Sequence, residues 1–307
     1  MNKPKVIVLI LSYNGKQLLD DSISSYLENE YSNFEVVVID NGSTDGTKEY
    51  VEGKWPEVFV LRTQENLKYS GGFNFGLDYA FNKEKADYVL ITNNDVKADR
   101  NVIPELVKVA ETDSSIGFVT GKVYFHDQPK ILQSTGKYAD LKYWRGGHRA
   151  GKEKDVGQFD IVEKIDWCDD IFWLVNRNLY LKTKGYDTEF QFQGEDFDWQ
   201  VRAKEIGYSI YYTPFAKIWH KESITIGKTS SFKAYYDARN PLIVHLKYRK
   251  PKEVQIYMRR QIKFQIKSSV KYLLKLKLSH FMATWKGYFS ALLWAKKNNK
   301  LTIKHFI

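Results

Sequence analysis

The sequence predicts an α/β fold in which helices cover both faces of a mostly parallel central sheet. Two observations support this prediction. Over the first 120 residues, short apolar runs alternate with segments of helical spacing, and the turns between them are short. Alternation of this kind is typical of parallel sheets. In such sheets ligands bind beyond the carboxyl ends of the strands, so we expect the loops after the strands to carry the chemistry.

The elements follow from the position of the apolar residues. Valine-rich and isoleucine-rich runs predict strands, and apolar residues three or four apart predict helices. Residues 121–165 are less regular and rich in glycine, and amphipathic helix follows Pro241. The expected strands are 6–12, 34–40, 58–63, 88–92 and 208–213, with an apolar segment at 171–175, and the expected helices are 16–28, 44–52, 72–81, 101–111 and a segment ending at Ile206.

The composition limits the class of protein. With 307 residues, of which 43% are hydrophobic, the chain can bury a full core. A single cysteine, Cys168, rules out a disulfide framework and suits a reducing compartment. The apolar run at Val6–Leu11 is too short for a signal peptide, and no window of about 18 uncharged apolar residues predicts a membrane span. We therefore expect a cytoplasmic protein.

The net charge of +10 is concentrated at one end of the chain. Residues 241–307 hold 16 lysines and arginines but one acid, Glu253, whereas the other 240 residues hold 31 basic and 36 acidic side chains. This contrast predicts a body at 1–245, in which the regular alternation of strand and helix ends at about residue 120. A basic amphipathic helical tail follows at 246–307.

The tail has three interpretations. Amphipathic helices rich in lysine can lie on an anionic bilayer. They can equally form a lid packed on the body, or an oligomer interface. We favour the membrane surface, which would place the protein peripherally on the inner face of the cell membrane. A nucleic-acid partner is not expected, because the body carries net negative charge.

Four polar clusters stand at successive strand ends. Asn-Gly and Asp-Gly pairs are good turn formers, so any one cluster could be structural. A turn needs only one or two special residues, however, and these loops are long runs of hydrogen-bond donors and acceptors. The clusters are Ser12-Tyr13-Asn14-Gly15, Asp40-Asn41-Gly42-Ser43-Thr44-Asp45-Gly46, Asn66 through Asn74, and Asn93-Asn94-Asp95.

In this order the clusters resemble the inverting family 2 glycosyltransferases of the GT-A fold, and within them the bacterial rhamnosyltransferase and galactofuranosyltransferase type. The third motif reads Ser70-Gly71-Gly72-Phe73-Asn74-Phe75-Gly76. The resemblance covers about residues 4–245, and it implies a nucleotide-binding half (1–120) and an acceptor-binding half (121–245). It implies a nucleotide-sugar donor, with a dTDP- or UDP-linked sugar as the expected kind, and a glycan or lipid-linked acceptor. It also implies a role in the synthesis of cell-surface polysaccharide.

The resemblance implies roles for the loop residues. Tyr13 would stack on the base, and Asp40 would accept a base N–H. Asn74 and the amides of a Gly71-Gly72 turn would lie close to the donor. The full set of expected donor-binding residues is Ser12, Tyr13, Asn14, Asp40, Gly71, Gly72, Asn74, Asn93, Asn94 and Asp95.

A divalent metal, Mn²⁺ or Mg²⁺, is expected beside the donor. Asn93-Asn94-Asp95 stands where the family has its Asp-x-Asp motif, so Asp95 is the expected carboxylate ligand. His220 follows Trp219 at the end of an expected strand. In similar enzymes a histidine here completes the metal site, although a lone histidine is often just a polar residue with a satisfied hydrogen bond.

The segment Glu195-Asp196-Phe197-Asp198 holds the expected catalytic acids. Acids that open a helix are an ordinary capping choice, but three in four residues repel one another. By resemblance to the family's Glu-Asp pair, Asp196 is the general base and Glu195 orients the acceptor. The chain departs from the family at Trp167-Cys168-Asp169-Asp170, where Asp169 or Asp170 could also reach the active site.

Other functions are less well supported. A catalytically inactive glycan-binding or scaffold protein, with a membrane- or nucleic-acid-binding tail, would be indicated by loss of Asp95 or Asp196, and both are present. A sugar-phosphate nucleotidyltransferase would show a glycine-rich, basic loop after the first strand, where this chain has Ser12-Tyr13-Asn14-Gly15.

Overall fold

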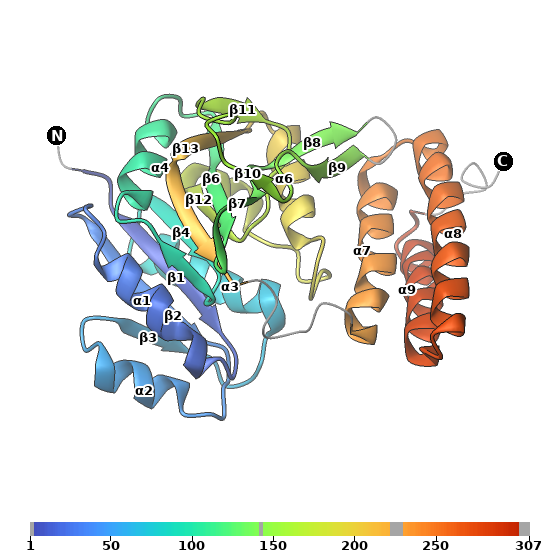
Figure 1. Ribbon diagram of the computed structural model, residues 1–307, viewed down its shortest axis with the longest axis horizontal. Coiled ribbons are helices and arrows are strands. Elements are labelled where there is room, and N and C mark those ends of the chain that lie inside the picture. The colour runs from blue at the N-terminus through green and yellow to red at the C-terminus, as the bar shows by residue number, and fades with distance from the viewer. Residues whose placement is uncertain (1–2, 141–143, 222–229, 301–307) are drawn as a thin grey trace. The chain divides into compact units, whose positions relative to one another are not determined.

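The computed structural model of the protein describes residues 3–140, 144–221 and 230–300 (Figure 1). The chain forms two compact units. Unit 1 comprises 1–139, 145–191 and 199–222, and unit 2 comprises 140–144, 192–198 and 223–307. The division into domains at residue 245 stays a prediction. Residue 245 lies within a helix of unit 2, α7 (Ser231–Tyr248).

The centre of unit 1 is a parallel sheet of four strands in the order β4-β1-β2-β3. Their bounds are β1 Val6–Ser12, β2 Phe34–Asp40, β3 Phe59–Arg62 and β4 Tyr88–Thr92. The expected bounds of β1, β2 and β4 are confirmed, and β3 is one residue shorter at each end. Because helices cover both faces, Val6 to Ile10 are fully buried, which is why β1 is a continuous apolar run.

The sheet continues beyond β4 with antiparallel pairs. β12 (Phe172–Asn176) lies between β4 and β6 (Ile116–Phe125) and is antiparallel to both. β13 (Ser209–His220) extends seven residues beyond the end of the strand expected at 208–213, because its second half pairs with β5 (Val96–Ala98) and β6. The remaining strands are β7 Gln128–Ser134, β8 Lys137–Asp140, β9 Trp144–His148, β10 Glu153–Lys154 and β11 Glu163–Ile165.

The helices mostly follow the sequence prediction, with shifted starts. They are α1 Leu19–Leu27 after a 3-10 turn at Lys16–Leu18, α2 Thr47–Lys54, α3 Lys68–Asp78 continued by a π-turn at Tyr79–Lys83, α4 Val102–Ala110, α5 Arg177–Thr183 and α6 Glu195–Glu205. α2 begins three residues later than expected, because Asp45 Oδ1 accepts a hydrogen bond from Thr47 N (3.1 Å) and Gly46 adopts a left-handed backbone (φ 77°) directly before the helix.

The expected Gly71-Gly72 turn is wrong, because both glycines lie inside α3. The helix starts at Lys68, whose backbone N–H donates to Asn66 Oδ1 at 2.8 Å. The glycines serve packing instead. A Cβ on Gly72 would lie 2.6 Å from Leu11 Cδ1 and 3.0 Å from Asn41 Nδ2, so an alanine here would displace both side chains.

Unit 2 is built on three helices that lie side by side, α7, α8 (Pro251–Leu274) and α9 (Leu278–Lys297) (Figure 1). The C-terminal helices expected from the sequence are confirmed, but α7 begins ten residues before Pro241. Ser230 Oγ caps it by accepting from Lys233 N at 3.1 Å. Tyr235 Oη donates to Ser290 Oγ (2.9 Å) and so joins α7 to α9. Within the described ranges, no helix combines the length and the apolar character that crossing a membrane requires.

Candidate active site

The loops after β1 and β2 are held together at the carboxyl edge of the sheet. Parallel register places Ser12 opposite Asp40. Asn14 adopts a left-handed backbone (φ 48°), its Oδ1 accepts from Thr44 N at 2.8 Å, and its backbone N–H donates to Ser43 Oγ at 3.0 Å. Asparagine tolerates this conformation better than most residues. Asn14 therefore shapes the site by bonding one loop to the other.

Asp40 is fully buried, and one of its carboxylate oxygens accepts no hydrogen bond within the described residues. Its Oδ1 accepts from Ser43 N at 2.9 Å. Its Oδ2 lies 3.4 Å from Arg62 Nη1 and accepts no hydrogen bond within the described residues. A buried carboxylate oxygen that has an ion-pair partner but no hydrogen bond keeps part of its desolvation cost uncompensated. This oxygen is therefore suited to an incoming N–H group.

Sequence reasoning missed Arg62 as a residue of the site. It ends β3 directly opposite Asp40 in the parallel register, and its Nη2 donates to Ser43 O at 3.0 Å. The signal that could have found it is register, since the carboxyl ends of paired parallel strands meet at one edge.

Tyr13 and Ser12 differ in exposure although they are neighbours. The Tyr13 side chain is 42% exposed at the loop surface, as stacking on a base requires. Ser12 is fully buried, and its Oγ has no hydrogen-bond partner in the described part of the chain. The donor-binding roles of both residues stay predictions.

Asn41 ties the second loop to the third, a role that sequence reasoning missed. Its Nδ2 donates to Asn66 Oδ1 (3.2 Å) and to Lys68 O (3.0 Å), and its Oδ1 accepts from Leu67 N (3.0 Å). The side chain is 2% exposed. It follows that Asn41 fixes the start of α3 next to Asp40.

Asn74 has a structural task in addition to its expected place near the donor. Its Nδ2 donates to Tyr186 O at 2.8 Å, and its Oδ1 accepts from Tyr186 N at 2.9 Å. This two-bond contact holds the segment before α6 against α3. A donor contact of Asn74, and of Gly71 and Gly72, stays a prediction.

Asp95 and His220 meet because β13 pairs with β5 in antiparallel register, with His220 opposite Val96. Their side chains are nearly buried, and His220 Nε2 lies 3.1 Å from Asp95 Oδ1. Gln133 Oε1 lies 2.9 Å from His220 Nδ1. An amide oxygen can only accept, so Nδ1 carries the hydrogen and Nε2 presents its lone pair to the carboxylate.

This arrangement fits a divalent cation. Two lone-pair atoms 3.1 Å apart need a cation in common, either a proton or a metal ion. Metal-binding histidines usually donate their other N–H to a neighbouring acceptor, which is the task of Gln133 here. Asn93 Nδ2 lies 3.5 Å from the same Nε2. Asn94 lies near the first loop, since a Cβ on Gly15 would lie 2.7 Å from Asn94 Nδ2.

Within the described ranges, no group of three or more histidine, cysteine, aspartate or glutamate side chains is arranged to hold a metal ion. The chain would thus supply one carboxylate and one imidazole, and a donor diphosphate would supply further oxygens.

The acidic cluster opens α6 in unit 2. Gln193 and Gly194 precede it with left-handed backbones (φ 60° and 93°), which turn the chain into the helix. Glu195 and Asp196 are 6% and 7% exposed. Asp196 Oδ1 accepts from Phe197 N at 2.7 Å. Both acids lie in the first turn, where the helix dipole favours negative charge.

The third acid of the cluster is structural. Asp198 is fully buried, and its Oδ1 accepts from Lys247 Nζ at 2.5 Å and from Tyr248 Oη at 2.7 Å. Its charge is therefore compensated by α7. This leaves Glu195 and Asp196 as the candidates for acid–base chemistry.

Asp169 and Asp170 have local partners in unit 1. Asp169 pairs with Lys137 and accepts from Ser134 Oγ at 3.0 Å. Asp170 Oδ2 accepts from Tyr186 Oη at 3.1 Å. These contacts give both acids a structural task, and a place for either in the active site stays a prediction.

Comparisons with known proteins identify the family of the chain. The family model for glycosyl transferase family 2 matches residues 7–178. The chain belongs to this family. It is a glycosyltransferase, and the narrower likeness to rhamnosyltransferases and galactofuranosyltransferases stays a prediction.

One curated relative is the poly-beta-1,6-N-acetyl-D-glucosamine synthase of Staphylococcus aureus (strain COL), 23% identical over 224 residues. The match covers 72% of this chain and 51% of the relative. The chain therefore spans about half the length of this curated relative.

Two solved structures share the fold. The mannosyltransferase PcManGT from Pyrobaculum calidifontis, in complex with GDP-Man and Mn²⁺, has a TM-score of 0.56 at 16% identity, covering 97% of this chain and 88% of that one. GalNAc-T7 with UDP, GalNAc and Mn²⁺ has a TM-score of 0.66 at 14% identity, covering 97% and 58%. At these identities the likeness concerns the fold, which is GT-A as expected.

Proposed function

We propose that this chain transfers a sugar from a nucleoside-diphosphate donor to a glycan or lipid-linked acceptor, with inversion at the anomeric carbon. We place the reaction in the synthesis of a cell-surface polysaccharide, by analogy with the staphylococcal synthase. The observation that carries the proposal is the pairing of His220 Nε2 with Asp95 Oδ1 at 3.1 Å. The same unit holds Asp40, whose Oδ2 accepts no hydrogen bond within the described residues.

The base of the donor is selected by Asp40. Uracil, thymine and guanine each present a ring N–H on the edge that pairs with another base, whereas cytosine and adenine present a ring nitrogen that accepts. Asp40 Oδ2 can only accept while the carboxyl is ionised. It therefore favours UDP, dTDP or GDP donors, and Tyr13 stacks on the face of the base. The two solved relatives hold GDP-Man and UDP.

Asp95 and His220 would hold the divalent metal, which neutralises the charge that develops on the departing diphosphate. Both solved relatives contain Mn²⁺, and imidazole suits Mn²⁺ better than Mg²⁺. Gln133 keeps the imidazole in the tautomer that offers Nε2.

Asp196 acts on the acceptor. It takes the proton from the acceptor hydroxyl while the hydroxyl oxygen attacks the anomeric carbon on the face opposite the leaving diphosphate, which inverts the configuration. Glu195 orients the acceptor hydroxyl. We assign the body (1–245) to this chemistry. The tail (246–307) is assigned to the inner face of the cell membrane, in an otherwise cytoplasmic protein.

The test is calorimetric titration of the purified chain with UDP, dTDP, GDP, CDP and ADP, with and without Mn²⁺. Binding of at least one of UDP, dTDP and GDP that strengthens with Mn²⁺ is expected. Asp95→Asn should remove the gain from the metal and keep the weaker binding. Asp127→Asn is the matched control, since this carboxylate is 94% exposed. If the unmodified chain binds the nucleotides with the same affinity with and without Mn²⁺, the proposed metal site is wrong.

A further inference from the structure

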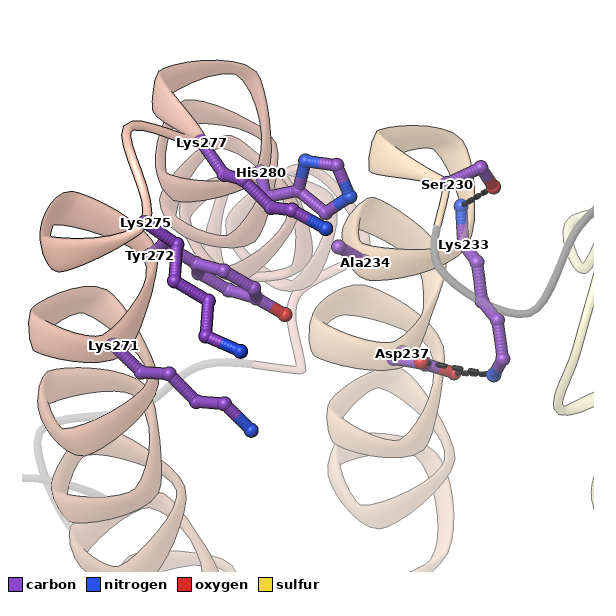
Figure 2. A pocket seen from close by; sticks show the side chains of 9 residues that line it. All are labelled: Ser230, Lys233, Ala234, Asp237, Lys271, Tyr272, Lys275, Lys277 and His280. Atoms are coloured by element: carbon purple, nitrogen blue, oxygen red, sulfur yellow. Dashed lines mark hydrogen bonds and ion pairs between the residues drawn. The ribbon is translucent and has the colours of Figure 1, made fainter.

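The helices of unit 2 border an open cavity of about 230 Å³ that is lined by lysines (Figure 2). Lys271 lies near the end of α8, Lys275 and Lys277 lie in the turn to α9, and Lys233 lies on α7. In Figure 2 the ammonium ends of Lys271 and Lys275 extend from α8 toward α7. The cavity therefore gathers cations from three successive segments of the chain.

The positive charge of this cavity is largely uncompensated. Lys233 Nζ lies 3.0 Å from both carboxylate oxygens of Asp237 and is paired. Within the described residues, Lys271, Lys275 and Lys277 form no ion pair. Four lysines and one carboxylate thus line the cavity, which gives it a net positive charge and predicts an anionic ligand.

A second cavity, of about 350 Å³, adjoins the first and shares Asp237 and Tyr272 with it. Gln265 lines this cavity and is 1% exposed, yet neither its Nε2 nor its Oε1 has a hydrogen-bond partner in the described part of the chain. A buried amide that bonds to nothing is destabilising. Both polar atoms of Gln265 are therefore open to a polar group that enters this cavity.

Exposed leucines stand next to the lysine-lined cavity. Leu274, Leu276 and Leu278 are 81%, 88% and 59% exposed, and they alternate with Lys275 and Lys277. Large apolar side chains grouped in this way usually mark an interaction surface. Leucines beside lysines are typical of segments that enter the boundary between headgroups and acyl chains.

We propose that unit 2 binds a membrane lipid that carries a phosphate. The leucines of the α8–α9 turn enter the bilayer, the lysine-lined cavity receives the phosphate, and Gln265 bonds to a polar substituent attached to it. Phosphatidylglycerol, with a phosphate and free hydroxyls, has this chemistry. The inference deepens the proposed function, on which it rests for the idea that the acceptor is found at a lipid surface.

The test is sedimentation of the full chain with vesicles, in the absence of nucleotide. Vesicles of phosphatidylcholine alone are compared with vesicles that also contain phosphatidylglycerol, and soluble glycerol phosphate is added as a competitor. We expect binding to need phosphatidylglycerol. Replacing Lys271, Lys275 and Lys277 together by glutamine should weaken it about a hundredfold, since each lysine near an anionic surface contributes roughly a factor of five.

The matched control replaces Lys252, Lys296 and Lys297 by glutamine. These lysines are exposed at the opposite end of the α8–α9 hairpin, and their replacement removes the same charge. An equal loss in both variants would mean that general surface charge binds the vesicles, and would overturn the cavity site. Glycerol phosphate that competes at the same concentration as the lipid would overturn the lipid assignment, as would tighter binding to a single-stranded oligonucleotide than to vesicles.

Two further variants separate ligand binding from folding. Leu276→Ser should weaken vesicle binding and leave thermal unfolding unchanged, because the side chain is already 88% exposed. Gln265→Leu should weaken vesicle binding about tenfold and leave the fold as stable or more stable, since an unsatisfied amide is removed. A Gln265→Leu variant that binds normally would exclude Gln265 from the site. The donor site is tested by nucleotide binding alone, so either proposal can fail without the other.

Discussion

Replacing Asp40 by asparagine should reverse the preference of the donor site for nucleobases. In the Asp40→Asn variant the amide oxygen can keep the bond to Ser43 N, which is 2.9 Å long in the native chain. The amide nitrogen then occupies the place of the spare Oδ2, so an acceptor becomes a donor. A base N–H would face another N–H, whereas the ring nitrogen N3 of cytosine would receive a hydrogen bond.

The size of the effect follows from the kind of bond that is lost. Hydrogen bonds to a charged group contribute about 1.5–3 kcal/mol, and every 1.4 kcal/mol is about tenfold in affinity. We therefore expect the preferred nucleotide among UDP, dTDP and GDP to bind about 10-fold to 150-fold more weakly. CDP should bind about tenfold more tightly than it does to the native chain.

The assay is calorimetric titration of both proteins with the nucleotide panel, after thermal unfolding has shown that the variant folds. Glu49→Gln is the control. Glu49 lies 3.7 Å from the same Arg62 but is 70% exposed, so its replacement removes a neighbouring charge and leaves the buried acceptor in place. If Asp40→Asn folds and keeps both its affinity and its order of preference, Asp40 does not contact the base.

Three further predictions test the metal, the base and the scaffold. Gln133→Leu frees His220 Nδ1 and should weaken Mn²⁺ affinity about 10-fold to 100-fold, which titration of the nucleotide complex measures. Asp196→Asn should spare donor binding and lower the rate of transfer about 10²-fold to 10⁴-fold, so near-normal turnover would remove Asp196 as the base. Lys122 is 2% exposed and lies 2.6 Å from Asp155 Oδ2, so Lys122→Met should cost about 3 kcal/mol in urea unfolding at neutral pH. Burial raises the pKa of Asp155, but the hydrogen bonds from Lys122, Tyr124 and the Gly157 backbone, together with the charge of Lys122, outweigh it, so the pKa is lowered. The contribution of the ion pair to stability is therefore present above about pH 4, the usual pKa of an aspartate. It is lost as the pH falls through the folded-state pKa of Asp155, where the variant and the native chain should converge in stability.

The fold class and most elements were readable from the sequence because their causes are local. A strand buried on both faces must be apolar at every position, and β1 is apolar throughout its buried run. The polar loops stood out because they interrupt such runs at the carboxyl end of each strand. Asp40 and Asp95 were predictable for the same reason, since each stands at the end of a buried strand.

Other features could not be predicted from the sequence, because they depend on contacts between residues that are far apart in the chain. The start of α3 depends on Asn41 accepting from Leu67 N, 26 residues away. The place of β12 between β4 and β6 depends on pairing across the sheet, on which a five-residue apolar run carries no information. In the sequence, Arg62 and Gln133 are polar residues of the kind found on any protein surface. Strand pairing and register bring them to the site.

By itself the sequence determined the α/β class, the strand ends that bear the chemistry, the family, and a tail whose lysines outnumber its acids. Only the tertiary structure decided which side chains meet. It placed His220 Nε2 3.1 Å from Asp95, left an oxygen of Asp40 without a donor among the described residues, and gathered lysines from α8 and the following turn beside exposed leucines. The reason is physical: hydrophobic periodicity is fixed by neighbours along the chain, whereas a hydrogen bond or an ion pair needs two groups that the folded topology brings together.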